Sequence, residues 1–145
     1  HIYSKICINS QERTNKMSKY VDGFVLVVPK ENAEAYREMA EEGRESWLKH
    51  GALEYYESKG YDLEPLSMGE DKSLSFKEAF GAGAEDDIWF SFIVFESKQA
   101  RDEVNEKVMA EMDEMYKDQS NFQSPFDPRK MAVGGFEVLV EGLKK

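Results

Sequence analysis

The chain alternates between short apolar runs and longer segments in which apolar residues recur every three or four positions. The apolar runs are rich in β-branched and aromatic residues, which is typical of strands. The segments with helical spacing predict two long helices. The predicted strands are 20–28, 52–59, 88–95 and 131–140, and the predicted helices are 33–50 and a second one that begins after Ser97.

The boundaries of both predicted helices agree with capping preferences. Asn32 precedes the first helix and Gly51 follows it, and Ser97 precedes the second helix. Each helix offers one apolar side to a sheet. The stripe of the first helix contains Tyr36, Met39, Ala40, Gly43, Trp47 and His50, and that of the second contains Ala100, Val104, Val108, Met112 and Met115.

The order of these elements is β-α-β-β-α-β, the pattern of ferredoxin-like α+β folds. We therefore expect two helices on one face of a four-stranded antiparallel sheet. The connection over 60–85 is long, with one short helix predicted over 75–80, so it should pack over the domain or form part of a site. In the last strand, Gly134 and Gly135 predict a bulge or a close approach to the backbone.

The segment IWFSFIVF, residues 88–95, has large apolar side chains at both parities. A sheet with helices on one side only should alternate between apolar and polar residues. Each large apolar side chain left in water on the second face would cost about 1.5–3 kcal/mol. We therefore expect a second copy of the chain to cover this face, sheet against sheet, in a homodimer. Ser91 either makes room for a cavity or forms a hydrogen bond between strands.

Residues 1–16 differ in character from the rest of the chain. They lack amphipathic spacing, contain Cys7, the one cysteine of the sequence, and precede Met17. We interpret them as an extension added in cloning or translated from upstream of a natural start at Met17. A genuine, flexible N-terminal arm is the alternative. Residues 17–145 are predicted to form a single domain.

The charge balance argues against several classes of partner. The whole chain has a formal net charge of −10, and residues 17–145 hold 16 basic and 28 acidic residues, a net charge of −12. This excess of acid opposes binding to nucleic acid and to anionic membranes. No apolar run approaches the roughly 20 residues of a membrane-spanning helix. Because residues 17–145 contain no cysteine, a reducing cytoplasm is the simplest location.

Four motifs, in this order along the chain, resemble the DUF1428 family of bacterial proteins. They are YVDGFV with the following VPK (20–30), WxxHGALEY (47–55), FSFIVFxSxxxRDxVNxKVM (90–109) and PFDxxxMxxGGF (125–136). The resemblance covers essentially residues 17–143. It implies a dimeric α/β barrel, in which two sheets pack face to face, and it implies no established activity. That broad superfamily includes small monooxygenases, haem-degrading enzymes, isomerases and non-catalytic proteins.

His50, the one histidine after the extension, is the first candidate for chemistry. Histidine is a natural general base or metal ligand near neutral pH. Glu54, on the next strand, could orient His50 or raise its pKa. The structural alternatives are a histidine that stabilises the C-terminus of a helix and a glutamate that is an ordinary surface charge.

A second candidate group could hold an anion or a carbonyl group. Arg101 and Asn105 lie one helical turn apart, and Arg129 could join them from the loop before the last strand. Salt bridges within the chain are the alternative. The glycine-rich segment 81–86 precedes a strand and carries acidic residues, so we reject a nucleotide site there. No zinc signature is present, and we predict neither a metal nor a cofactor.

These observations together predict a cleft between the helices and the sheet of each subunit. We expect Trp47, Trp89 and Ser91 to line it with His50, which suits a small, partly apolar organic ligand. One hypothesis is a cofactor-independent enzyme, of monooxygenase or isomerase type, in which His50 or a carboxylate moves protons. The other is a non-catalytic binding or stress-related protein that uses this cavity or only the dimer surface.

Overall fold

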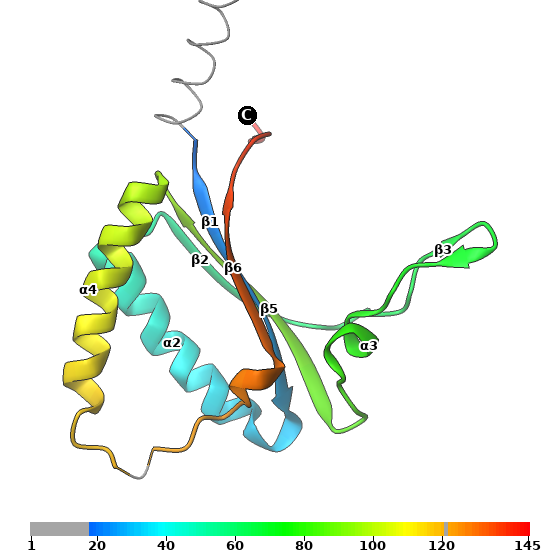
Figure 1. The fold of residues 1–145 in the computed structure, drawn as a ribbon, viewed down its shortest axis with the longest axis horizontal. Helices are drawn as coiled ribbons and strands as arrows, with labels where there is room; N and C mark the ends of the chain where they lie inside the picture. Colours follow the sequence, from blue (N-terminus) through cyan, green and yellow to red (C-terminus); the bar gives the residue numbers. More distant parts are fainter. Residues whose placement is uncertain (1–17, 121) are drawn as a thin grey trace, which may run out of the picture.

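The computed structural model describes residues 18–120 and 122–145, so the expectations for residues 1–16 lie outside it. Two long helices lie on one side of a four-stranded antiparallel sheet (Figure 1). This architecture confirms the α+β class and is consistent with a ferredoxin-like fold. The elements are β1 (Tyr20–Pro29), η1 (Lys30–Asn32), α2 (Ala33–His50), β2 (Glu54–Lys59), β3 (Ser67–Met68), β4 (Asp71–Lys72), α3 (Phe76–Phe80), β5 (Asp86–Phe95), α4 (Lys98–Tyr116), η2 (Pro128–Lys130) and β6 (Met131–Glu137).

The four-stranded sheet has the order β2-β5-β1-β6, with the two longest strands at its centre. β1 and β5 pair antiparallel along their whole length, and Phe24 lies opposite Ser91. Paired residues point to the same face, and successive residues alternate between faces. Within β5, Ser91 and Ile93 therefore face the helices, whereas Phe90 and Phe92 face the other way.

The helix boundaries follow from the predicted caps, with one difference. The Ser97 hydroxyl accepts a hydrogen bond from the backbone N–H of Ala100 at 3.0 Å and caps α4, as expected. Asn32 occupies the N-cap position of α2, but its side chain makes no capping bond. Its amide group instead donates to the carbonyl oxygen of Pro125 at 3.1 Å. The start of α2 is therefore tied to the segment that leads into β6.

The long connection between β2 and β5 contains a hairpin that the sequence pattern did not predict. β3 and β4 pair antiparallel and project away from the main sheet (Figure 1). Strands of two residues are too short to show an alternation of apolar and polar positions, which is why they were missed. The predicted short helix is confirmed as α3, with Ser75 as its N-cap. Leu66, Met68 and Leu74 are exposed along this projecting segment.

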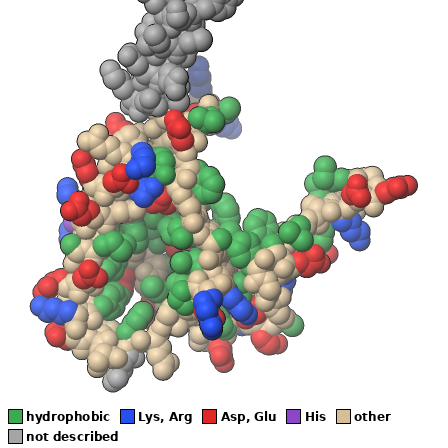
Figure 2. All heavy atoms as spheres, in the orientation of Figure 1, with side chains coloured by type: hydrophobic (Ala, Val, Ile, Leu, Met, Phe, Trp, Pro, Cys, Tyr) green, Lys and Arg blue, Asp and Glu red, His purple; other side chains and the backbone are tan. Residues whose placement is uncertain are grey.

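The face of the sheet opposite the helices carries large exposed apolar side chains. Phe90, Tyr56 and Phe136 are 45%, 47% and 61% exposed. The rings of Tyr56 and Phe92 pack with their centroids 4.8 Å apart. Figure 2 shows apolar side chains both between the helices and the sheet and on the other side, toward the projecting hairpin. This face has the character that the sequence predicted, and its cover by a second copy stays a prediction.

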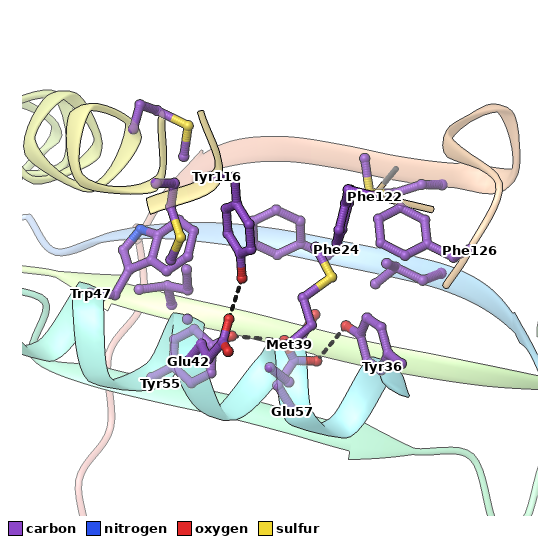
Figure 3. Close-up of a pocket in the computed structure, with 18 residues that line it drawn as sticks. Phe24, Tyr36, Met39, Glu42, Trp47, Tyr55, Glu57, Tyr116, Phe122 and Phe126 are labelled. Carbon is purple, nitrogen blue, oxygen red and sulfur yellow. Dashed lines mark hydrogen bonds between the residues drawn. The ribbon is translucent and has the colours of Figure 1, made fainter. Parts of the chain in front are cut away.

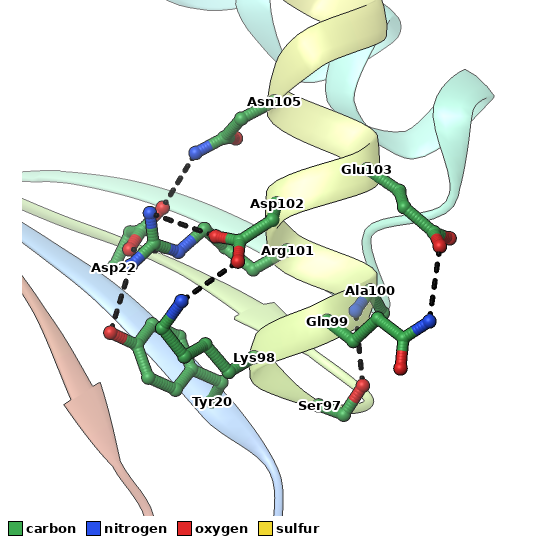
Figure 4. Close-up of polar contacts among 10 residues, drawn as sticks. All are labelled: Tyr20, Asp22, Ser97, Lys98, Gln99, Ala100, Arg101, Asp102, Glu103 and Asn105. Carbon is green, nitrogen blue, oxygen red and sulfur yellow. Dashed lines mark hydrogen bonds and ion pairs between the residues drawn. The ribbon is translucent and has the colours of Figure 1, made fainter.

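A polar network attaches the first half of α4 to β1 (Figure 4). A guanidinium nitrogen of Arg101 donates to the Tyr20 hydroxyl at 2.8 Å, and Nε lies 3.4 Å from Oδ1 of Asp22. The Asn105 amide donates to Oδ2 of Asp22 at 3.2 Å. Asp22 is buried, at 7% exposed, so its charge is compensated by these groups instead of by water.

Gly135 leaves the space that this network needs. β6 pairs with β1 without a bulge, and Asp22 lies opposite Gly135. A Cβ atom at Gly135 would lie 2.7 Å from a guanidinium nitrogen of Arg101 and would also collide with the Tyr20 hydroxyl. The sequence predicted either a bulge or a close approach to the backbone at Gly134 and Gly135. The close approach is confirmed at Gly135, where the side chains of Tyr20 and Arg101 lie against the backbone. No helix within the two described ranges is long and apolar enough to cross a membrane.

We expect Gly135→Ala to lower the free energy of unfolding by about 1–3 kcal/mol, because the added methyl group forces Tyr20 and Arg101 apart. Gly134→Ala is the matched control, since its Cβ would meet only the flexible Phe136 ring, at 3.4 Å. Urea denaturation of both variants measures the difference. Equal destabilisation by the two substitutions would contradict this explanation.

Candidate functional site

The interior between the helices and the sheet contains a pocket of about 470 Å³ (Figure 3). The buried core is divided into two clusters, one around Tyr36 and Trp89 and the other around Phe95 and Val108. Members of both clusters contribute to the pocket wall, so the pocket lies between them. The lining residues are Phe24, Leu26, Tyr36, Met39, Ala40, Glu42, Gly43, Trp47, Tyr55, Glu57, Ser91, Ile93, Met109, Met112, Tyr116, Phe122, Phe126 and Met131.

The lining is dominated by aromatic rings and methionines. Among residues 18–120 and 122–145, no lysine, arginine or histidine lines the pocket. Its polar side chains are those of Glu42, Glu57, Ser91 and three tyrosines, with the indole N–H of Trp47 donated to Asn105. A cavity of this size and character is typical of sites for small organic molecules, in which a few polar groups set the orientation of the ligand.

Glu57 is the central polar group of the pocket. The Tyr36 hydroxyl donates to Oε2 of Glu57 at 2.8 Å, and the Tyr55 hydroxyl donates to Oε1 at 2.9 Å (Figure 3). Tyr55 and Glu57 lie two residues apart on β2 and so share a face, and Tyr36 comes from the start of α2. Ser91 lies opposite Glu57 on β5. One carboxylate is thus held by hydroxyl groups from a strand and a helix.

Burial controls the ionisation of this cluster. It raises the pKa of Glu57, and hydrogen bonds from Tyr36, Tyr55 and Ser91 oppose this rise in part. Burial and the neighbouring Glu57 charge raise the pKa of both tyrosines well above the usual value of 10. The two hydroxyls therefore stay protonated donors, and Glu57 holds its proton to higher pH than an exposed glutamate does.

A contact between the two long helices closes part of the pocket. The Tyr116 hydroxyl of α4 donates to the Glu42 carboxylate of α2 (Figure 3). This hydrogen bond, with burial, raises the pKa of Tyr116 to about 12. The Tyr116 ring packs against Phe122, with the ring centroids 5.4 Å apart. The segment after α4 therefore continues the wall that α4 begins.

A second, more polar cavity of about 550 Å³ lies between α2 and β2. Arg37, Arg44 and Lys59 line it together with acidic residues of α2. We call this second cavity the outer groove and the apolar cavity of Figure 3 the inner pocket. Tyr55 and Glu57 line both of them. They therefore form part of the wall between an apolar interior and a charged surface.

Three of the predicted site residues lie around these cavities. Trp47 and Ser91 line the inner pocket. Trp89 lines the outer groove and is 8% exposed. Its ring meets the Tyr36 ring edge-on, with centroids 4.8 Å apart. The two tryptophans are thus placed on the two sides of the wall that contains Glu57.

His50 and Glu54 lie outside the pocket lining. His50 ends α2, and its Nε2 atom is hydrogen-bonded to the Glu111 carboxylate of α4, which also lies 3.2 Å from Nζ of Lys49. These neighbours lower the pKa of Glu111 through hydrogen bonds. Glu54 is exposed on the opposite face of the sheet and accepts a hydrogen bond from the Tyr56 hydroxyl at 3.1 Å. Both positions agree with the structural alternatives for these residues.

The predicted group of Arg101, Asn105 and Arg129 is not brought together. Arg101 and Asn105 belong to the network around Asp22, and Asn105 also accepts a hydrogen bond from Nε1 of Trp47 at 2.9 Å. Through this bond the network reaches one wall of the pocket. Arg129 is exposed and pairs with Asp127 at 3.0 Å.

Glu57, Tyr36 and Tyr55 line the candidate site and were not predicted as site residues from the sequence. A signal was present, because Tyr36 belongs to the apolar stripe of α2 and period-two alternation places Tyr55 and Glu57 on one face. The signal was ambiguous, because the same alternation places Glu54 and Tyr56 on the other face. Within the described part of the chain, no group of three or more His, Cys, Asp or Glu side chains could hold a metal ion.

Comparison with known proteins identifies relatives whose names state no biochemical activity. The family model described as "Protein of unknown function (DUF1428)" matches residues 19–128. The "Uncharacterized protein YbaA" of Escherichia coli strain K12 is 36% identical over 123 residues, which cover 85% of this chain and 98% of that protein. The YbaA protein of Shigella flexneri matches with the same identity and coverage. The resemblance noted in the four sequence motifs is confirmed.

We expect the Glu57 carboxyl group to titrate above the usual glutamate pKa of 4.5. Between 4.5 and its raised pKa, the folded chain holds a proton that the unfolded chain has released, so the free energy of unfolding falls as pH rises through this window. Glu57→Gln should remove this part of the pH dependence, and the exposed Glu54→Gln should leave it. Carbon-detected NMR titration and urea denaturation from pH 4 to 8 measure both effects. A Glu57 that titrates like an exposed glutamate would contradict its burial.

Proposed function

We propose that this chain, which belongs to the DUF1428 family, binds a small and mostly apolar organic molecule in the pocket between α2, α4 and the sheet. The observation that carries the proposal is the 470 Å³ cavity whose apolar lining surrounds one fixed carboxylate, Glu57. Apolar surface on a ligand and on the lining would leave water together, which favours binding. The carboxylate and the tyrosine hydroxyls would orient the polar end of the ligand.

The charge of the lining narrows the class of ligand. Glu57 places negative charge in the pocket, and no cationic side chain of the described residues lines it to hold an anion. A carboxylate or phosphate ligand would therefore lose its hydration without gaining a partner. Neutral molecules with aromatic or alicyclic rings fit best, including ketones, phenols and quinones. Both a cofactor-independent enzyme and a non-catalytic binding protein are compatible with such a ligand.

We expect 2-naphthol or 2-tetralone to raise the melting temperature, because a ligand at 100 times its Kd stabilises the folded state by about 2.7 kcal/mol. Met109→Trp should weaken this effect by filling the pocket. Met115→Trp is the matched control, since both methionines are 48% exposed on α4 and only Met109 lines the pocket. Thermal shift and calorimetric titration measure binding. Equal affinity in the two variants would place the ligand elsewhere.

We also propose that two copies of the chain associate through the sheet face opposite the helices, as the predicted dimeric α/β barrel requires. The exposed Phe90, Tyr56 and Phe136 support this, because a patch of large apolar side chains on a sheet favours burial against another surface. A non-catalytic or stress-related role that acts through this surface is the second candidate function. The same exposed rings favour it.

Light scattering at micromolar concentration should show a dimer. Phe90→Asp should give monomers, because Phe90 is 45% exposed in the single chain and its replacement costs the fold little. The more buried Phe92→Asp should give monomers or insoluble protein. Leu48→Asp, at a similarly exposed position on α2, is the control and should stay dimeric. A stable wild-type monomer would refute the association.

A further inference from the structure

Glu57 occupies a position that ligand binding alone does not explain. It lines the apolar inner pocket and the charged outer groove at the same time. A half-buried carboxylate such as that of Glu57 is costly unless hydrogen bonds compensate it, and an amide or a hydroxyl would orient a neutral ligand at lower cost. A carboxylate has one property that those groups lack, which is the ability to take up a proton from a bound molecule and to release it again.

We propose that Glu57 is a catalytic residue, a general base that removes a proton from a neutral carbonyl compound bound in the inner pocket. This inference rests on the proposed binding function and names the substrate class as small apolar ketones with an acidic C–H bond beside the carbonyl group. The Tyr36 and Tyr55 hydroxyls, at 2.8 and 2.9 Å, occupy one site on each carboxylate oxygen and fix its plane. Further lone pairs on both oxygens are free to accept the substrate proton.

The transfer conserves charge within the pocket. The C–H bond beside the carbonyl group breaks, and its proton bonds to an oxygen of Glu57. The electron pair of that bond forms the carbon–carbon double bond of an enolate, whose negative charge lies on the former carbonyl oxygen. The charge of the Glu57 carboxylate is replaced by that of the enolate while Glu42 is unchanged, so the pocket gains no charge and no cationic side chain is required. Ser91 faces the pocket opposite Glu57, and its hydroxyl, released when the Glu57 carboxylate takes up the proton, can then donate to the enolate oxygen.

The proton then has two routes. In a substrate whose enolate is conjugated with a further carbon–carbon double bond, return of the proton to the far end of that conjugated system restores the carboxylate and gives an isomer, and this reaction requires no oxidant or co-reactant. Exchange of the Glu57 proton with a proton of water in the outer groove is the second route, and return of the new proton to the same carbon regenerates the ketone and the carboxylate. The second route follows from the place of Glu57 in the wall between the two cavities, and it exchanges substrate hydrogen with solvent.

The electrostatics of the cluster suit this role. Burial raises the pKa of Glu57, which makes the carboxylate a stronger base than an exposed glutamate. The tyrosine hydroxyls limit that rise, so that the carboxylate form is kept available. His50, the base that the sequence suggested, lies outside the lining and pairs with Glu111.

The test follows hydrogen–deuterium exchange at carbon 1 of 2-tetralone in deuterated buffer by proton NMR, with binding measured in parallel by calorimetry. Wild-type protein should accelerate exchange about 100-fold or more over a protein-free sample. Glu57→Gln should still bind 2-tetralone and should lose the acceleration, whereas Glu54→Gln should keep both. A sample with 2-naphthoate in place of the ketone should show no binding, because the pocket offers its carboxylate no counter-charge.

A further variant separates a catalytic role from a structural one. Tyr36→Phe removes a hydrogen bond that favours the carboxylate, so the rise of exchange rate with pH should move to higher pH while exchange persists. Equal exchange by wild-type and Glu57→Gln proteins that both bind 2-tetralone would overturn the general base and leave the binding function intact. Failure of the wild-type protein to bind 2-tetralone would overturn both. Melting curves of each variant confirm that it is folded.

Discussion

The ion pair between Arg101 and Asp22 is the interaction on which the shape of the site depends. It joins α4 to β1, and Asn105 extends it to Trp47, so that two helices and a central strand are held at one end of the domain. A buried charge that loses its partner costs several kcal/mol, so arrangements of α4 that separate Arg101 from Asp22 are strongly disfavoured. Burial raises the pKa of Asp22, and Asn105 and Arg101 oppose that rise. The network specifies one arrangement of the helices more than it adds stability.

With that end fixed, the opposite halves of the helices surround the pocket. Near the network the core is filled by Phe95, Val104 and Val108. Farther along α4, Met109 and Met112 replace these β-branched and aromatic residues at the wall of the pocket. Methionine side chains are flexible and adapt to different shapes, so this part of the wall can fit ligands of more than one outline. The rigid end and the adaptable end therefore belong to the same pair of helices.

The sequence was sufficient for the fold because its patterns were long. Ten paired residues in each central strand and two helices of 18 and 19 residues give clear periodicity. The β3–β4 hairpin was missed because its strands have two residues each. Among site residues, Trp47 and Ser91 were found because burial and a break in an apolar run mark them. His50 was predicted as a site residue because histidine is a common general base. The type of a residue does not determine whether its side chain lies in a pocket, and His50, at the end of α2, lies outside the pocket lining.

Glu57 was harder to predict, because the strand that carries it is nearly symmetrical. β2 begins EYYE, in which Tyr55 donates to Glu57 at 2.9 Å and Tyr56 donates to Glu54 at 3.1 Å. The two pairs have the same composition and the same spacing, and they lie on opposite faces of one strand. The first faces an apolar cavity, and the second is exposed. In a single chain the exposed pair is thus an internal comparison for the pair in the pocket: any difference in acidity between the two glutamates measures the pocket together with the further hydrogen bonds that Tyr36 and Ser91 donate to Glu57.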